Sequence, residues 1–219
     1  MGVFRFHMSI SLDGYVAGPD QSVDDPIGVG GMRLHEWFFD LVAWRRMQGL
    51  DGGVVNASTP VVDEAMSNVG AVVMGRNMFG GGPGPWSEDP PWRGWWGDDP
   101  PYHAPVFVLT HHPREPLEME GGTTFHFVTD GIHSAYEQAK LAAGGRDVSL
   151  GGGASAAQQY LAAGLIDEFE LHVVPVLLGA GERLFDGVDD PGLTPVEVAH
   201  SPLATHIRYL VGPRTRTSA

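Results

Sequence analysis

Three short apolar runs in this sequence each end where a helical pattern begins, and this repeated change restricts the fold more than any other feature. The runs are AVVMG at 71–75, PVFVLT at 105–110 and VSLGGG at 148–153. Strands that alternate with helices in this way are typical of α/β proteins. The segment 193–211 reads instead as two strands with no helix between them. We therefore predict an α/β fold with a mostly parallel central sheet and an antiparallel C-terminal edge hairpin.

The other periodic segments fit a single domain over residues 1–219, since neither an internal repeat nor a domain boundary is visible. Alternating apolar residues predict a first strand at 3–12. Further strands are predicted at 123–129 and 167–179, and helices at 35–47, 58–70, 131–145 and 154–165.

Residues 80–104 (GGGPGPWSEDPPWRGWWGDDPPYHA) form a Trp/Pro/Gly-rich insert without any periodicity. Irregular segments of this length are usually functional or disordered, and so many aromatic residues argue against disorder. We predict a structured flap whose tryptophans either close over a ligand or cover the outer edge of a partner subunit. The tryptophans are Trp86, Trp92, Trp95 and Trp96.

The charge of the chain restricts its partners. Thirteen basic and 27 acidic residues give a net charge of −14, which repels phosphate backbones and anionic lipids. We therefore expect no nucleic acid and no membrane surface as partner. The sequence contains no cysteine, no signal-peptide pattern and no apolar stretch of the ~20 residues that a bilayer span requires. These features are typical of a cytoplasmic protein.

Three consecutive glycines, Gly151, Gly152 and Gly153, lie where a predicted strand passes into a predicted helix. Ligands of open α/β sheets bind beyond the carboxyl ends of the strands, where glycine lets backbone N–H groups approach a phosphate. The alternative is a tight turn that packs the helix against the strand. Neither a G-x-G-x-x-G fingerprint nor a P-loop is present to decide between the two.

Basic residues favour the ligand-binding interpretation. Arg76 follows Gly75 directly, and Thr110, His111 and Arg114 follow the next apolar run. A chain with only thirteen basic residues thus places several of them at two of the three strand ends. This distribution is expected for a phosphate-rich dinucleotide with an additional 2′-phosphate. A surface salt bridge for Arg76 and an exposed turn for the histidines are the alternatives.

The sequence favours neither a metal centre nor nucleophilic hydrolysis. Its ten histidines lack ligand spacing such as H-E-x-x-H, and it contains no G-x-S-x-G motif. We therefore expect no metal.

Four motifs together resemble the reductase domain of the bifunctional riboflavin-biosynthesis deaminase/reductase enzymes, the RibD C-terminal domain of the dihydrofolate-reductase-like superfamily. The motifs are MSISLDGYVAG, VVMGRNMF, PVFVLTHHPR and LGGGASAAQQYLAAGLIDEFELHVVPVLLGAGERLF. The resemblance extends over 3–211 in the order of the family. The cysteines and the H-x-E signature of the zinc deaminase are missing, so only the reductase module is similar. The Trp-rich insert departs from the pattern of the riboflavin enzymes.

The resemblance implies a three-layer, dihydrofolate-reductase-like fold that binds NADPH across the strand ends and a small heterocyclic substrate beside it. It also implies a homodimer. The implied cofactor-binding residues are Ala17 near the nicotinamide, Gly75, Arg76 and Asn77 at the phosphates, Thr110, His111 and Arg114 around the 2′-phosphate, and Gly151, Gly152, Gly153, Ala154 and Ser155 at the pyrophosphate.

Asp13 is the expected catalytic residue and also an expected substrate contact. It follows the first predicted strand in an LDG motif, where the resemblance implies an aspartate that contacts the substrate. A water molecule oriented by Asp13 would supply the proton. The alternative is an Asx-turn in which Asp13 caps the loop.

Glu36 and Asp40 offer a competing acid, because they lie four residues apart on a predicted helix. Dihydrofolate reductases carry their pterin-binding acid at about this place. Acids near a helix N-terminus also complement the helix dipole without any role in binding. The remaining substrate-binding residues that we expect are Trp37, Pro175 and Val176.

These expectations predict an NADPH-dependent reductase of a pyrimidine- or pterin-like heterocycle, similar to 5-amino-6-(5-phosphoribosylamino)uracil reductase of riboflavin biosynthesis. Two alternatives stay open, namely dihydrofolate reductase activity and a non-catalytic nucleotide-binding module, because a fold alone does not decide function.

Overall fold

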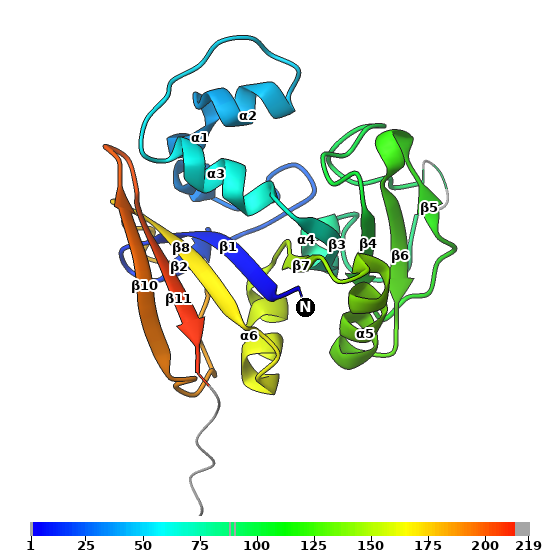
Figure 1. Ribbon diagram of the computed structural model, residues 1–219. Coiled ribbons are helices and arrows are strands. Elements are labelled where there is room, and N and C mark those ends of the chain that lie inside the picture. Colours follow the sequence, from blue (N-terminus) through cyan, green and yellow to red (C-terminus); the bar gives the residue numbers. More distant parts are fainter. Residues whose placement is uncertain (1, 88, 90, 213–219) are drawn as a thin grey trace, which may run out of the picture.

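The computed structural model describes residues 2–87, 89 and 91–212 (Figure 1). Within these residues, nine strands form the main sheet in the order β10-β11-β8-β1-β7-β3-β4-β6-β5. Their bounds are β1 Phe4–Ser11, β3 Val69–Gly75, β4 Pro105–Leu109, β5 Leu117–Glu118, β6 Thr124–Val128, β7 Asp147–Leu150, β8 Glu168–Val174, β10 Leu193–His200 and β11 Thr205–Val211.

The six central strands, from β8 to β6 in the sheet order, pair in parallel, and the other three pair antiparallel at the two edges. The predicted α/β fold and its C-terminal hairpin of β10 and β11 are therefore confirmed. A second sheet that the sequence did not predict pairs β2 (Tyr15–Ala17) with β9 (Glu182–Arg183).

Helices cover both faces of the sheet (Figure 1). Their bounds are α1 Glu36–Phe39, α2 Val42–Met47, α3 Thr59–Met66, α4 Arg76–Phe79, α5 Ile132–Ala143 and α6 Ala154–Ala163. Helices α5 and α6 bury alanines and Tyr160 against phenylalanines of β1, which forms the largest core. Helices α1 to α3 lie over the opposite face of β1, β8 and β11. None of the described helices is both long and apolar enough to cross a bilayer.

The prediction of one helix at 35–47 is wrong in one respect, because the segment forms two helices, α1 and α2. Leu41 separates α1 from α2 in an extended conformation, with φ −68° and ψ 140°. The returning chain explains the break. Val54 donates its N–H to the carbonyl of Asp40 at 2.7 Å and accepts the N–H of Val42 at 3.0 Å. This pairing holds Leu41 almost completely buried, at 1% exposure.

The Trp-rich insert packs against the outer half of the sheet and has its own core. Trp86, Trp92 and Trp96 contact a cluster of buried residues that includes Phe79 and Phe125. Three indole N–H groups donate to backbone carbonyls at 2.8–3.1 Å. Trp86 donates to His112, Trp92 to Phe79 and Trp95 to Met78. The insert is thus a folded part of the domain and not a loose connection.

Candidate functional site

A cavity of about 870 Å³ opens at the carboxyl ends of β3, β4 and β7 and extends under α1 and α3. We call its two parts the glycine end and the histidine end. The glycine end is lined by Gly75, Arg76, Asn77, Thr110, His111 and the segment 151–155. The histidine end is lined by His7, Ser9, His35, Trp37 and His172.

The glycine end is built from main chain that two neighbouring strands hold in place. The N–H of Gly75 donates to the carbonyl of Gly152 at 2.7 Å, and the N–H of Gly151 donates to Val73 at 2.8 Å. Gly152 has φ +117°, a backbone conformation that is strained for residues other than glycine. A Cβ on Gly153 would meet nothing within 4 Å, so this surface is open to the cavity. Helix α6 begins here, and its first N–H groups have no partner within the helix.

Arg76 is the cation at this end. Its guanidinium lies 3.1 Å from the centre of the Trp86 ring, and its Nη2 donates to the carbonyl of Gly82 at 2.9 Å. Its Nε and Nη1 are buried without a hydrogen-bond partner. Burial, and then the nearby charge of Arg114, lower the pKa of Arg76 to about 10, so it remains a cation at neutral pH.

The residues expected around the 2′-phosphate are only partly brought together. Thr110 and His111 line the cavity. Arg114 does not, because its Nη1 donates to the carbonyl of Trp92 at 2.6 Å and its guanidinium lies 5.2 Å from the Trp86 ring. The insert thus holds Arg114 beneath its tryptophans. A phosphate in this conformation would meet Arg76 and His111 rather than Arg114.

These features fit the phosphate groups of NADPH. An open glycine surface, a helix N-terminus and Arg76 all lie at this end of the cavity. Ala17, on β2, lines the same cavity. The residues that would hold the cofactor are therefore present together.

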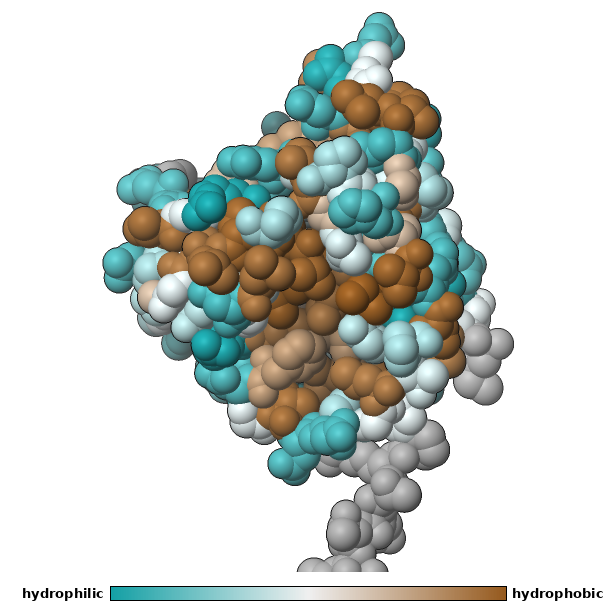
Figure 2. Space-filling view, turned by 90° about the vertical axis from the view of Figure 1, so that its left-hand side faces the viewer, coloured by the Kyte–Doolittle hydropathy of each residue, from teal (hydrophilic) through white to brown (hydrophobic). Residues whose placement is uncertain are grey.

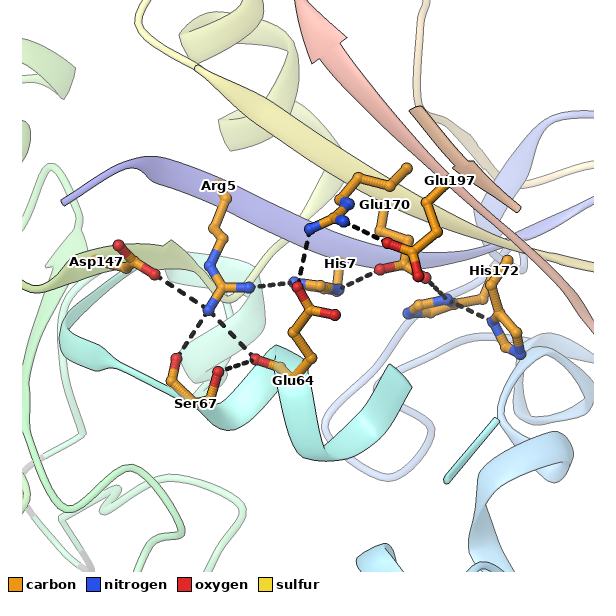
Figure 3. Close-up of polar contacts among 10 residues, drawn as sticks. Arg5, His7, Glu64, Ser67, Asp147, Glu170, His172 and Glu197 are labelled. Atoms are coloured by element: carbon orange, nitrogen blue, oxygen red, sulfur yellow. Dashed lines mark hydrogen bonds and ion pairs between the residues drawn. The ribbon is translucent and has the colours of Figure 1, made fainter. Parts of the chain in front are cut away.

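The histidine end results from strand register. His7 and Ser9 of β1 pair with Glu170 and His172 of β8, and His172 pairs with His206 of β11. Because alternate residues of a strand face the same side, these polar side chains form a layer on one face of the sheet. Figure 3 shows His7, Glu170 and His172 together with Arg5, beside the helix that carries Glu64.

Arg5 determines the tautomer of His7. The guanidinium of Arg5 can only donate, so His7 Nε2, at 3.2 Å, accepts. Neutral His7 therefore carries its proton on Nδ1, which lies 3.5 Å from a carboxylate oxygen of Glu170. Arg5 in turn is held by the carbonyl of Ser67 at 2.8 Å and by Asp147 at 3.3 Å.

Burial decides the charges of this layer. Desolvation, and then Arg5 and Arg208, lower the pKa of His7 to about 3. Desolvation likewise lowers the pKa of His206 to about 4 and that of His172 well below its ordinary value. Burial, and then Glu64, raise the pKa of Glu170 to about 7. The imidazoles are therefore neutral at physiological pH and present N–H donors and nitrogen acceptors.

Flat and apolar side chains complete the histidine end. Trp37 donates its indole N–H to Ser9 Oγ at 2.9 Å, and its ring lies 4.7 Å from that of His172. The remaining apolar walls are formed by Phe38, Trp44, Met47, Val62, Ala65 and Met66, with Trp95 and Trp96 of the insert. The arrangement suits a planar ring with polar edges, stacked on aromatic walls above a polar floor.

Most of the residues expected from the sequence line this one cavity. They are Ala17, Trp37, Gly75, Arg76, Asn77, Thr110, His111, Gly151, Gly152, Gly153, Ala154 and Ser155. Arg114, Asp13, Asp40, Pro175 and Val176 are not among its lining residues.

Asp13 fastens a loop. Its carboxylate accepts the N–H groups of Leu178 at 3.2 Å and Gly179 at 2.7 Å and the hydroxyl of Ser11 at 2.5 Å. These bonds, that of Ser11 first, lower the pKa of Asp13 to about 2. In this conformation the carboxylate is committed to the loop, in line with the capping alternative.

The competing acids and the expected apolar wall also lie elsewhere. Glu36 and Asp40 are exposed, because α1 turns its aromatic residues inward and its acids outward. Pro175 is exposed, and Val176 packs behind Trp37 against Leu34 and Leu41. Among the described lining residues, Glu182 is the only carboxylate, and it pairs with Ala17 across the small sheet.

The sequence analysis missed His7, Ser9 and His172. A signal was present, since the strand at 3–12 alternates apolar residues with Arg5, His7 and Ser9. That alternation indicates two chemically different faces. It does not reveal which other strands add to the polar face.

Comparisons with known proteins agree with this geometry. Residues 4–204 match the family of RibD C-terminal domains. A protein from Shewanella sp. PV-4, named as a candidate riboflavin biosynthesis protein, is 20% identical over 96% of this chain and 99% of its own, with a TM-score of 0.61. No curated protein matches the chain.

Two further solved structures share the fold. The diaminohydroxyphosphoribosylaminopyrimidine deaminase/5-amino-6-(5-phosphoribosylamino)uracil reductase of Thermotoga maritima is 13% identical, with a TM-score of 0.53, over 96% of this chain and 57% of its own. Dihydrofolate reductase from Enterococcus faecalis, complexed with NADP(H), is 12% identical over 95% of this chain and 96% of its own, with a TM-score of 0.52. At these identities the likeness shows the dihydrofolate-reductase-like fold.

Proposed function

Because the chain belongs to the family of RibD C-terminal domains, whose members are NADPH-dependent reductases, we propose that it is an NADPH-dependent reductase of a pyrimidine- or pterin-like heterocycle. One observation carries this proposal. A single cavity joins an end that suits phosphates to an end that suits a flat ring with polar edges.

At the glycine end, the chain binds and orients. Backbone N–H groups at the start of α6 meet the phosphates, and the positive charge of Arg76 attracts them. NADPH, when bound, supplies the hydride. The open surface at Gly153 lets the cofactor approach the main chain closely.

At the histidine end, the chain aligns the substrate. Trp37, Phe38 and Trp44 stack against the ring, and Nε2 of His172, the ring nitrogen that His206 does not bind, meets a polar group on its edge. A neutral imidazole nitrogen can donate or accept, so it can pair with either kind of group on the edge of a pyrimidine. The aromatic walls exclude water from the reacting face.

The acids expected to anchor a pterin do not line the cavity, and neither does Asp13, the acid expected to contact a pyrimidine. Glu36 and Asp40, expected to anchor a pterin, are exposed and outside the cavity lining. A carboxylate that cannot reach the ring cannot stabilise its protonated form. No observation favours the dihydrofolate alternative over the pyrimidine.

The test is binding of NADPH by calorimetry, followed by NADPH oxidation with a ribosylaminopyrimidinone. Ser155→Glu places a negative charge in the first turn of α6, where it complements the helix dipole but repels a pyrophosphate. We expect its NADPH affinity to fall roughly 10–100-fold. Ala162→Glu, on an exposed position of the same helix, is the matched control and should bind as the wild type does. No heat with NADPH would refute the proposal.

We also propose that two copies of the chain associate through the face that carries β10. Val196 and Val198 of β10 are exposed by 47% and 65%. Figure 2 shows the hydrophobic residues gathered on this side of the molecule. Light scattering should give the mass of a dimer for the wild type and that of a monomer for Val198→Lys. A monomeric wild type would remove this proposal.

A further inference from the structure

Two neighbouring strands bring three ligating side chains together behind the histidine end. Glu170 and His172 belong to β8, and His206 of β11 pairs directly with His172. They are 6%, 5% and 1% exposed. The two Nδ1 atoms lie 2.9 Å apart, and His172 Nδ1 lies 4.0 Å from Glu170 Oε1. The ligand atoms of all three residues lie within 4.8 Å of one another.

These separations are close to those of a metal site. Four ligands at 2.0–2.2 Å from a tetrahedral ion are roughly 3.3 Å apart. The two imidazole nitrogens would separate slightly, and the carboxylate would approach. The sheet fixes both backbones, so such changes require only small side-chain rotations.

Among the described residues, no lysine or arginine forms an ion pair with Glu170. The guanidinium of Arg208 is taken by Glu64 and Glu197, and that of Arg5 by Asp147. A buried carboxylate without a cationic partner is costly. A divalent ion would neutralise it.

The neighbouring residues hold the ligands in position. Ser58 Oγ lies 2.8 Å from Nε2 of His206, which is the nitrogen that faces away from the cluster. His7 Nδ1 approaches the second oxygen of Glu170 at 3.5 Å. The ring of Trp37 packs against both imidazoles, at 4.7 and 4.8 Å. Partners of this kind orient ligands in known metal sites.

We propose that Glu170, His172 and His206 bind one divalent transition-metal ion of the zinc class. Two imidazoles and one carboxylate form the ligand set of zinc sites that leave a position open, whereas magnesium and calcium prefer oxygen alone. His172 also lines the large cavity, which connects this site to the substrate region. The site goes beyond the proposed reductase activity and does not depend on it.

The sequence could not reveal this site. His172 and His206 are 34 residues apart and meet only through strand pairing. The competing explanation is a hydrogen-bonded histidine pair that closes the sheet without any ion. The two explanations differ in their response to added metal.

The experiment is a calorimetric titration of chelator-treated protein with Zn²⁺, with Co²⁺ absorption as a second readout of coordination. We expect one equivalent to bind to the wild type. Glu170→Gln and His206→Gln should each weaken binding by more than the roughly 10–100-fold typical for residues that only orient a ligand. Ser58→Ala keeps all three ligands and should weaken binding roughly tenfold.

His200→Gln is the matched control, because His200 is an exposed histidine on the adjacent strand β10. It should bind Zn²⁺ as the wild type does. Circular dichroism establishes that each variant is folded. Absence of Zn²⁺ binding to the wild type, or equal binding by folded Ser58→Ala, Glu170→Gln and His206→Gln, would overturn the proposal. NADPH binding is measured on the same samples, so failure of this site is distinguished from failure of the reductase assignment.

Discussion

The two ends of the cavity are built by different means. At the glycine end, main-chain groups and one arginine form the surface of the cavity, and nearly all of them lie in short segments at 75–77, 110–111 and 151–155. At the histidine end, isolated side chains from β1 and β8, with α1, form the surface. The first end suits the phosphates of a ligand, and the second presents a flat aromatic wall with polar side chains.

Under the proposed function, the glycine end holds the cofactor and the histidine end selects the substrate. A backbone surface recognises charge and shape that all dinucleotides share. A layer of side chains with defined tautomers recognises one arrangement of donors and acceptors. Four changes test whether the two ends are as separate as this comparison implies.

Trp37→Ala should have the largest effect. Trp37 is 6% exposed and packs against His172 and His206, so its loss should lower the free energy of unfolding by about 3–5 kcal/mol. Trp95→Ala, which removes a half-buried ring that lines the same cavity, is the control and should cost less. Urea denaturation measures both. If both variants lost the same free energy of unfolding, the histidine end would be no more part of the core than the insert is.

Arg76→Ala should affect the cofactor rather than the fold. Loss of a charged donor should weaken NADPH binding by about 1.5–3 kcal/mol, which calorimetry measures. Arg146→Ala removes an exposed arginine that bonds Val69 and should leave binding unchanged. An unchanged affinity in Arg76→Ala would show that the glycine end recognises its ligand without this cation.

Acid should destabilise the histidine end. His7, His172 and His206 have lowered pKa values, so between pH 6.5 and about 4 they take up protons only in the unfolded chain. The free energy of unfolding therefore falls as the pH falls through this window. Glu170, whose pKa is raised to about 7, takes up its proton first in the folded chain and opposes this trend.

His7→Gln isolates one of these groups. It should reduce the slope of stability against pH by about 1.4 kcal/mol per pH unit in that window. Urea denaturation between pH 7 and pH 4 provides the measurement. A slope identical to that of the wild type would mean that His7 is accessible to protons in the folded protein.

Asp13→Asn should have the smallest effect. The amide of asparagine has one acceptor oxygen where the carboxylate has two. It therefore keeps only some of the hydrogen bonds from Ser11, Leu178 and Gly179, and the thermal midpoint should fall slightly. NADPH affinity should not change, because Asp13 is not a lining residue of the cavity. Loss of turnover at an unchanged midpoint would instead return Asp13 to the reaction.

The glycine end was largely predictable from sequence because its information is local. A strand, a glycine and a helix start follow one another within a few residues at Gly75 and at Gly151, and parallel strands bring such points to one edge. Arg114 shows the limit. It follows the right strand, but Trp92 of the insert binds it, and no local pattern indicates that contact.

The histidine end was not predictable because it depends on register between distant strands. His7, His172 and His206 meet only when β8 inserts between β1 and β11. The break at Leu41 has a similar cause, since Val54 pairs with the chain there and overrides a helical pattern. Hydrophobic periodicity describes each segment but not its partners.

The position of Trp86 gives this protein an internal optical probe. The centre of its ring lies 3.1 Å from the guanidinium of Arg76 and 5.2 Å from that of Arg114. The emission of an indole responds to charges beside its ring, so any ligand that draws Arg76 toward itself changes the fluorescence spectrum. Occupancy of the cavity can therefore be followed in real time without a label, and heterocycles can be screened as ligands by intrinsic tryptophan fluorescence.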